Sequence, residues 1–149
     1  MNSNNHITVD QIKNDAEVIK KELVEWRHYL HAHPELSFKE ERTTHYIVNK
    51  LKNFGYTDIQ IGFGPLKTGV MVEIGSGRPC VMLRADIDAL PIQEQTGVEF
   101  CSQSKGVSHA CGHDAHITNL LGVAKLLKKY ENSIKGRVKL LFQPAESTV

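Results

Sequence analysis

The stretch SHACGHDAHITNLLGVAKLLKKYENSIKGRVKLLFQPAE, residues 108–146, decides the fold. After a polar turn, apolar residues recur at helical spacing and predict a helix that ends near residues 131–132. The run RVKLLF at 137–142 is of the apolar kind that forms a buried central strand. A helix followed by such a strand indicates an α/β domain with a partly parallel sheet.

Two further helices are predicted upstream. An apolar stripe runs from Val9 to Leu30 at steps of three and four, with Thr8 and Gln11 at capping-box spacing before it. Pro34 disfavours helical geometry at the residue before it and ends this helix. A second helix follows, and the pair Ser37 and Glu40 is its expected capping box. We expect Gly55 to form its C-terminal cap. The apolar face of this helix consists of Ile47, Val48, Leu51 and Phe54.

Three strand-like runs lie between the helices, at residues 57–63, 68–75 and 80–87. With the helices, they predict one layered α/β domain over residues 1–149. In open α/β sheets, ligand sites collect beyond the carboxyl ends of the strands. The segments RADID, SHACGHDAH and QPAE would all emerge there, so we expect these three polar segments to converge.

Composition narrows the class of protein. The 149 residues carry 18 basic and 17 acidic side chains, a net charge of +1, which lacks the basic excess of a nucleic-acid-binding surface. The polar start has no signal-peptide core, and no segment approaches a membrane span. Three irregularly spaced cysteines suit reduced thiols better than a disulfide framework. We therefore expect a cytoplasmic protein that binds neither nucleic acid nor membrane.

The densest cluster of metal-binding side chains is SHACGHDAH, which holds His109, Cys111, His113, Asp114 and His116. The helix that follows favours anions at its start, so we expect the pKa of Cys111 to be lowered. The alternative for this segment is a polar loop with a buried cysteine and solvated histidines.

Carboxylates and histidines elsewhere are weaker candidates. Strand periodicity puts Asp86 and Asp88 on one face, where Asp86 is favoured by position; the alternative is a strand end turning into solvent beside Arg84. Glu146 follows a buried strand and could accept a proton from a metal-bound water, although a lone Glu is usually solvated. His31 and His33 form a His-x-His pair that could bind metal, but the preference of histidine for helix C-termini favours a structural role for both.

Four ordered segments resemble one enzyme family. WRHYLHAHPELSFKEERTT (26–44), LRADIDALPIQEQTG (83–97), SHACGHDAH (108–116) and LLFQPAE (140–146) are similar to the amidohydrolase branch of the aminoacylase and carboxypeptidase metallopeptidases. That branch includes hippurate hydrolases, N-acyl-amino-acid amidohydrolases, acetyl-diaminopimelate deacetylases and indole-acetyl amino acid hydrolases. The resemblance covers residues 20–149.

The resemblance implies the N-terminal part of a three-layer α/β/α exopeptidase-like domain with a two-metal centre. Cys111 then matches a bridging thiolate ligand, His113 a terminal imidazole ligand and Glu146 the general base, with Asp86 in a supporting role. Zinc is the first expectation, and manganese, cobalt or nickel are alternatives. The substrates would be small N-acylated amino acids or peptides. The family's homodimer forms through an inserted domain that this sequence lacks.

One position departs from the family pattern. Ser147 stands where the family has a second glutamate, which is a metal ligand, and the sequence ends at Val149 before two further histidine ligands. A neutral hydroxyl brings no charge to a divalent cation. Two hypotheses follow: the chain is the N-terminal part of a metal-dependent amidohydrolase, or it is a catalytically inactive fragment. For this chain alone we expect little or no activity.

Overall fold

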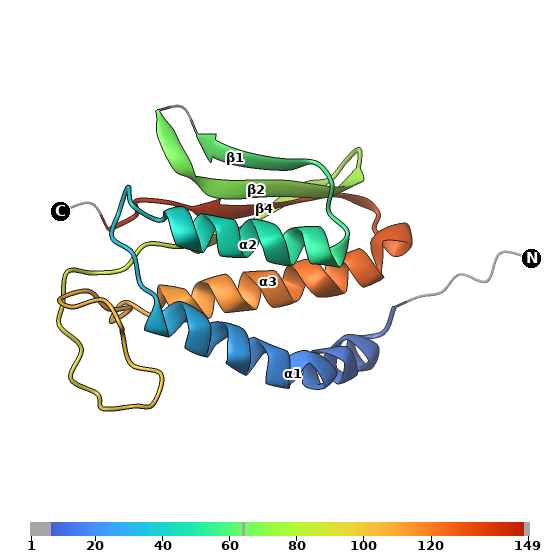
Figure 1. The fold of residues 1–149 in the computed structure, drawn as a ribbon. Helices are drawn as coiled ribbons and strands as arrows, with labels where there is room; N and C mark the ends of the chain where they lie inside the picture. The colour runs from blue at the N-terminus through green and yellow to red at the C-terminus, as the bar shows by residue number, and fades with distance from the viewer. Residues whose placement is uncertain (1–6, 64, 148–149) are drawn as a thin grey trace, which may run out of the picture.

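The computed structural model describes residues 7–63 and 65–147. Its elements follow one another in the predicted order: two helices, three strands, a third helix and a last strand (Figure 1). In chain order they are α1 (Val9–Ala32), α2 (Glu41–Phe54), β1 (Ile59–Phe63), β2 (Leu66–Ser76), β3 (Cys80–Asp86), α3 (His113–Lys129), the 3₁₀ turn η1 (Glu131–Ser133) and β4 (Gly136–Gln143).

Helix α1 begins and ends as predicted. The Thr8 side chain accepts a hydrogen bond from the Gln11 amide and the Gln11 side chain accepts one from the Thr8 amide, so the capping box is present. The helix ends at Ala32, two residues before Pro34. Over the described residues, none of the helices has the length and apolarity needed to cross a bilayer.

The predicted capping box of α2 is wrong. Glu40 is the N-cap residue, but it makes no side-chain cap bond. Its carboxylate is fully buried instead and accepts hydrogen bonds from Thr68 Oγ1 and the Ala145 amide, both at 2.8 Å. Tertiary partners have therefore displaced the local ones. The C-terminal cap is confirmed, because Gly55 is left-handed with a φ of 96°.

The four strands form one mixed sheet in the order β1-β2-β4-β3. Strand β2 pairs with β1 and β4 antiparallel, and β3 pairs with β4 parallel. The predicted central strand is confirmed, since β4 lies between two neighbours and buries Leu140 and Phe142 completely. The expectation of an α/β fold with a mixed sheet is therefore confirmed.

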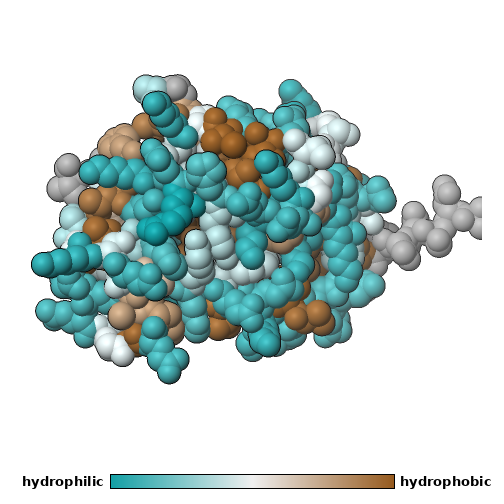
Figure 2. All heavy atoms as spheres, in the orientation of Figure 1, coloured by the Kyte–Doolittle hydropathy of each residue, from teal (hydrophilic) through white to brown (hydrophobic). Residues whose placement is uncertain are grey.

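The helices of the described chain lie on one side of this sheet (Figure 1). Helices α2 and α3 contact the strands, and α1 packs mainly on α3. The core between these layers contains the inward side chains Val70, Val72, Ile74, Ile117 and Leu121. On the face drawn in Figure 2, hydrophilic side chains predominate and apolar atoms form separate patches.

A long connection joins β3 to α3, and residues 87–112 contain neither a helix nor a named strand. Leu90 and Ser108 form an antiparallel bridge, so the connection returns to the place where it starts. Loops of this length inside a compact domain are usually functional. Both ends of this loop therefore lie at the carboxyl edge of β3 and β4.

Candidate metal centre

Parallel pairing of β3 and β4 brings the predicted polar segments together. Asp86 and Gln143 are direct partners in the register, so both strands end at the same edge. Asp88 lies just past the end of β3 and Glu146 just past the end of β4. Helix α3 begins beside them at His113, the residue that both carboxylates approach.

His113 is the central residue of the site and is almost fully buried. Its Nδ1 lies 2.9 Å from the carbonyl oxygen of Asp88, and this oxygen can only accept, so Nδ1 carries the proton. The lone pair of the neutral ring is then on Nε2, which lies 3.9 Å from Glu146 Oε2. A histidine held through one nitrogen and free at the other is the usual arrangement of a metal ligand.

Asp88 is fully buried and holds several parts of the site. Its Oδ2 accepts hydrogen bonds from Ser37 Oγ and from the Ser147 amide, both at 2.7 Å. Burial alone would raise the pKa of Asp88, but these two bonds, with a hydrogen bond from its own backbone amide and the charge of His113, lower that pKa. Its Oδ1 lies 3.3 Å from His113 Nδ1 and has no hydrogen-bond partner among the described residues.

Glu146 is exposed at the mouth of the site. The residue before it, Ala145, has a φ of 53° in the left-handed region, which is uncommon for a residue other than glycine. The buried carboxylate of Glu40 accepts the Ala145 amide and so holds this backbone conformation. Glu40 therefore orients Glu146, a role that the sequence pattern does not reveal.

Cys111 lies beside His113 and Asp88. Its sulfur is 3.8 Å from the Asp88 carbonyl oxygen, the same atom that His113 contacts. Burial raises the pKa of the Cys111 thiol, and the charges of Asp88 and Asp114 add to this effect. The expected lowering of that pKa by the helix is therefore wrong, because desolvation and two nearby carboxylates outweigh the field of α3.

Asp86 makes a different set of contacts. Its Oδ1 accepts hydrogen bonds from Arg84, at 2.7 Å from Nε and 2.6 Å from Nη2, so much of its charge is neutralised. Asp88, and not Asp86, contacts the Nδ1 side of the His113 ring. His33 takes no part in the site, because its Nδ1 bonds to the Tyr29 carbonyl oxygen within α1.

The donor set fits a divalent cation. Asp88, His113 and Glu146 each offer a ligand atom, and these three atoms lie within 4.8 Å of one another. Asp86, His113 and His116 form a second group of the same kind. Oxygen and nitrogen donors beside a thiol are the ligands of zinc and its neighbours. Among the described residues, Cys111 belongs to neither of these groups of three.

The chain matches known proteins in sequence. Residues 82–149, which include Asp88, Cys111, His113 and Glu146, match the model of peptidase family M20/M25/M40. The N-acyl-L-amino acid amidohydrolase of Geobacillus stearothermophilus is 44% identical over 142 residues, which are 94% of this chain and 38% of that protein. The N-acetyl-L-cysteine deacetylase of Bacillus subtilis is 52% identical over 86% of this chain and 30% of its own length.

Solved structures agree with the fold. A dinuclear metal-binding M20 peptidase from Bacillus subtilis superposes with a TM-score of 0.77 and 47% identity, over 87% of this chain and 36% of that one. A structure from methicillin-resistant Staphylococcus aureus superposes with a TM-score of 0.87 and 42% identity, over 95% and 37%. The chain thus corresponds to the N-terminal portion of its M20 relatives and spans 30–38% of the length of the two curated ones above.

Proposed function

We propose that this chain forms the N-terminal part of the catalytic domain of a metal-dependent amidohydrolase. The observation that carries the proposal is the orientation of His113, whose Nδ1 is held by Asp88 and whose Nε2 faces Glu146. Its M20 relatives are named amidohydrolases and deacetylases, which supports amide hydrolysis as the reaction.

His113 and Cys111 would hold the cation. Because the Bacillus subtilis structure is described as a dinuclear metal-binding peptidase, the proposal includes a second metal ion for the longer protein. Zinc is the metal we expect first, with manganese, cobalt or nickel as alternatives, because the donors mix nitrogen, sulfur and oxygen. Asp88 orients the His113 ring and acts through it. Asp86 has a supporting place beside His116.

A bound cation supplies a water of lowered pKa and polarises the amide carbonyl. Glu146 then acts as the general base: its carboxylate accepts a proton from the attacking water and returns it to the leaving nitrogen. Its exposure at the mouth of the site leaves room for a substrate. The bond between Glu40 and Ala145 keeps the carboxylate in place for both transfers.

The proposed substrates are small N-acylated amino acids or peptides, as the names of the relatives suggest. A net charge of +1 gives no support for nucleic acid as a partner. All three cysteines are free, which supports a reducing compartment such as the cytoplasm. A homodimer formed through an inserted domain remains part of the proposal for the longer family protein.

A second candidate function is favoured by Ser147, which replaces a carboxylate that the family resemblance makes a metal ligand. Its amide bonds to Asp88 and its hydroxyl lies 3.3 Å from Glu146, so the side chain sits at the site without bringing a charge. The alternative is therefore a chain that binds a cation weakly and does not catalyse.

Titration of the purified chain with Co²⁺ tests the metal site, since cobalt–thiolate absorption reports a bond to sulfur. We expect one ion per chain and loss of the thiolate band in Cys111→Ala, with Cys101→Ala as the matched control because Cys101 is exposed. Equal binding by Cys111→Ala and the unaltered chain would reject the site. Hydrolysis of N-acetyl amino acids by the unaltered chain, lost in Glu146→Gln, would exclude the inactive alternative.

A further inference from the structure

A second buried cluster lies behind the site, around His31 near the end of α1. The His31 side chain is 12% exposed, and each of its ring nitrogens faces a carboxylate oxygen. Nδ1 lies 2.8 Å from Asp114 Oδ2, and Nε2 lies 3.0 Å from Glu94 Oε1. Neither contact has a part in the chemistry proposed above.

This geometry determines the protonation state of the ring. Ionised carboxylates only accept hydrogen bonds, and a neutral imidazole can donate from only one nitrogen. In the neutral form, one nitrogen lone pair would therefore face an oxygen lone pair at hydrogen-bond distance. The two contacts are both favourable only if His31 is an imidazolium that donates from both nitrogens.

The charges around the ring support the same conclusion. Arg27 lies one helical turn before His31 and donates from Nε to the same Asp114 oxygen at 3.2 Å. With the charge of Arg27 set against the two carboxylates, one from α3 and one from the loop, one net negative charge still faces the ring, and this favours its cationic form. His109, from the turn before α3, also lies near the ring; it is buried, and its ring nitrogens have no hydrogen-bond partner among the described residues.

One end of this cluster holds the start of α3. Asp114 is the second residue of α3, is fully buried and follows His113 directly. Anchoring its side chain on α1 restrains the rotation of the first helical turn about its axis. The direction of the adjacent His113 side chain, and the place of Cys111 two residues earlier, depend on that restraint.

The other end holds the long loop. Glu94 also accepts the Ser102 amide at 2.6 Å and a hydrogen bond from the Thr96 hydroxyl, so it closes the loop segment between residues 94 and 102. That loop starts after Asp86 and returns to Cys111. His31 therefore ties the middle of the loop to the beginning of the helix.

We propose that His31, as a doubly donating imidazolium, is a positioning residue that fixes the turn carrying Cys111 and His113 through Asp114 and Glu94. The importance of this turn for cation binding rests on the function proposed above. The clamp itself does not depend on it and can be measured without any metal.

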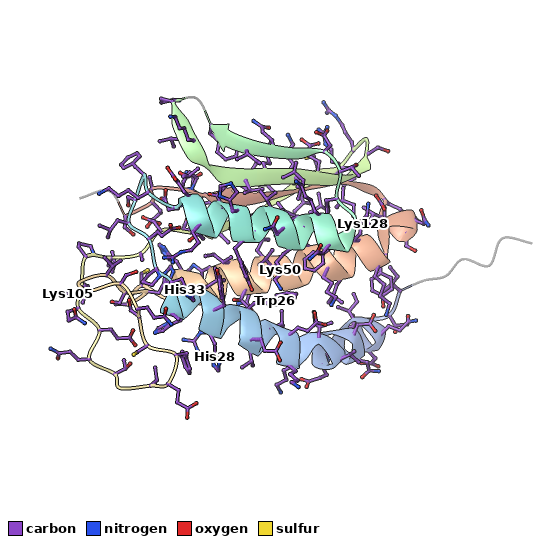
Figure 3. All side chains as sticks on the ribbon, in the orientation of Figure 1. Trp26, His28, His33, Lys50, Lys105 and Lys128 are labelled. Atoms are coloured by element: carbon purple, nitrogen blue, oxygen red, sulfur yellow. The ribbon has the colours of Figure 1, made fainter. Side chains whose placement is uncertain are left out.

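Nitrogen NMR of the histidine rings in the full 149-residue chain tests the protonation state directly. At neutral pH we expect both His31 nitrogens to give the similar shifts of an imidazolium. Two widely separated shifts, one protonated and one bare, would overturn the proposal. His33, labelled in Figure 3 near the end of α1, serves as the internal reference, because within residues 7–63 and 65–147 only its Nδ1 has a hydrogen-bond partner, the Tyr29 carbonyl oxygen.

Amide hydrogen exchange tests the positioning role. The amides of Ala115 and His116 bond to the Gly112 carbonyl oxygen and so report the turn. In His31→Gln, which keeps one donor, we expect these two amides to exchange about tenfold faster. His33→Gln is the matched control on the same helix end and should leave them unchanged. Unchanged exchange in His31→Gln would refute the role.

A second variant covers the case in which His31→Gln does not fold. Glu94→Gln keeps the size of the side chain and removes one of the two carboxylate charges. We expect it to lower the pKa of His31 and to speed exchange at the same amides by a smaller factor. An unchanged His31 titration in Glu94→Gln would also count against the clamp.

Co²⁺ titration separates this proposal from the proposed function. If the unaltered chain binds Co²⁺, His31→Gln should weaken binding by about tenfold or more, as is typical when a residue behind a ligand is lost. If the unaltered chain binds no Co²⁺, the metal site is rejected, while the ring NMR and the amide exchange still decide whether His31 is the clamp.

Discussion

The Nδ1 atom of His113 lies 2.9 Å from the carbonyl oxygen of Asp88, so the first turn of α3 is bonded to the segment just past β3. This single contact selects the tautomer of the ring and leaves Nε2 free toward Glu146. The backbone of Asp88 therefore sets the direction of His113, and the buried side chain of Asp88 supports it.

Removing the charge of Asp88 should weaken the site. In Asp88→Asn we expect the affinity for Co²⁺ to fall by about 10- to 100-fold, because the ring loses a charged neighbour on its Nδ1 side. Titration followed by absorption measures the change. Asp58→Asn is the control, since Asp58 is exposed at the start of the sheet. Equal affinities in both variants would contradict the role given to Asp88.

Restoring a carboxylate at residue 147 should strengthen the site. Ser147 already approaches Asp88 and Glu146, so the side chain of Ser147→Glu begins at the right place. We expect Zn²⁺ affinity to rise by about tenfold or more, because a charged oxygen ligand replaces a neutral hydroxyl. Competition with a chromophoric chelator measures this. Ser147→Gln, of similar size but uncharged, should not show the gain.

The burial of His109 predicts that the folded protein loses stability in weak acid. Burial lowers its pKa from 6.5 to about 4, so between these values the unfolded chain binds more protons than the folded chain. The free energy of unfolding should therefore fall as pH falls through this window, by up to about 3 kcal/mol from this group. Urea unfolding at several pH values measures the slope.

A matched pair of variants assigns that slope. His109→Gln should flatten it, because the titrating group is gone, whereas His45→Gln should leave it, because His45 is exposed on α2. A slope that persists in His109→Gln would mean that another group binds the protons. The deep burial of His109, whose ring nitrogens have no partner among the described residues, is the reason for the prediction.

The central strand should dominate stability. Phe142 is completely buried in β4 beneath the helices, and Phe142→Ala should lower the free energy of unfolding by about 3–5 kcal/mol through lost burial and a new cavity. Urea unfolding measures this. Val18→Ala is the control because Val18 is 80% exposed on α1, and its loss should cost less than about 0.5 kcal/mol.

The sequence by itself determined the helices, the buried strand and the resemblance to one enzyme family. Local signals were sufficient there, because capping at Thr8, the left-handed Gly55 and the apolar run of β4 act over a few residues. The order of these elements also predicted a parallel pair of strands, and hence that polar segments would meet at one edge. The resemblance to a known family supplied the proposed chemical roles of Cys111, His113 and Glu146.

Only the tertiary structure decided how the polar side chains are partnered. Glu40 was expected to cap α2 but is buried between Thr68 and Ala145, and Cys111 was expected to be acidified by α3 but lies beside carboxylates. His31 is spaced as a helix-end residue but joins Asp114 and Glu94 from distant segments. These partners lie far apart in sequence, and burial sets the strength of each contact, so no local pattern can reveal them.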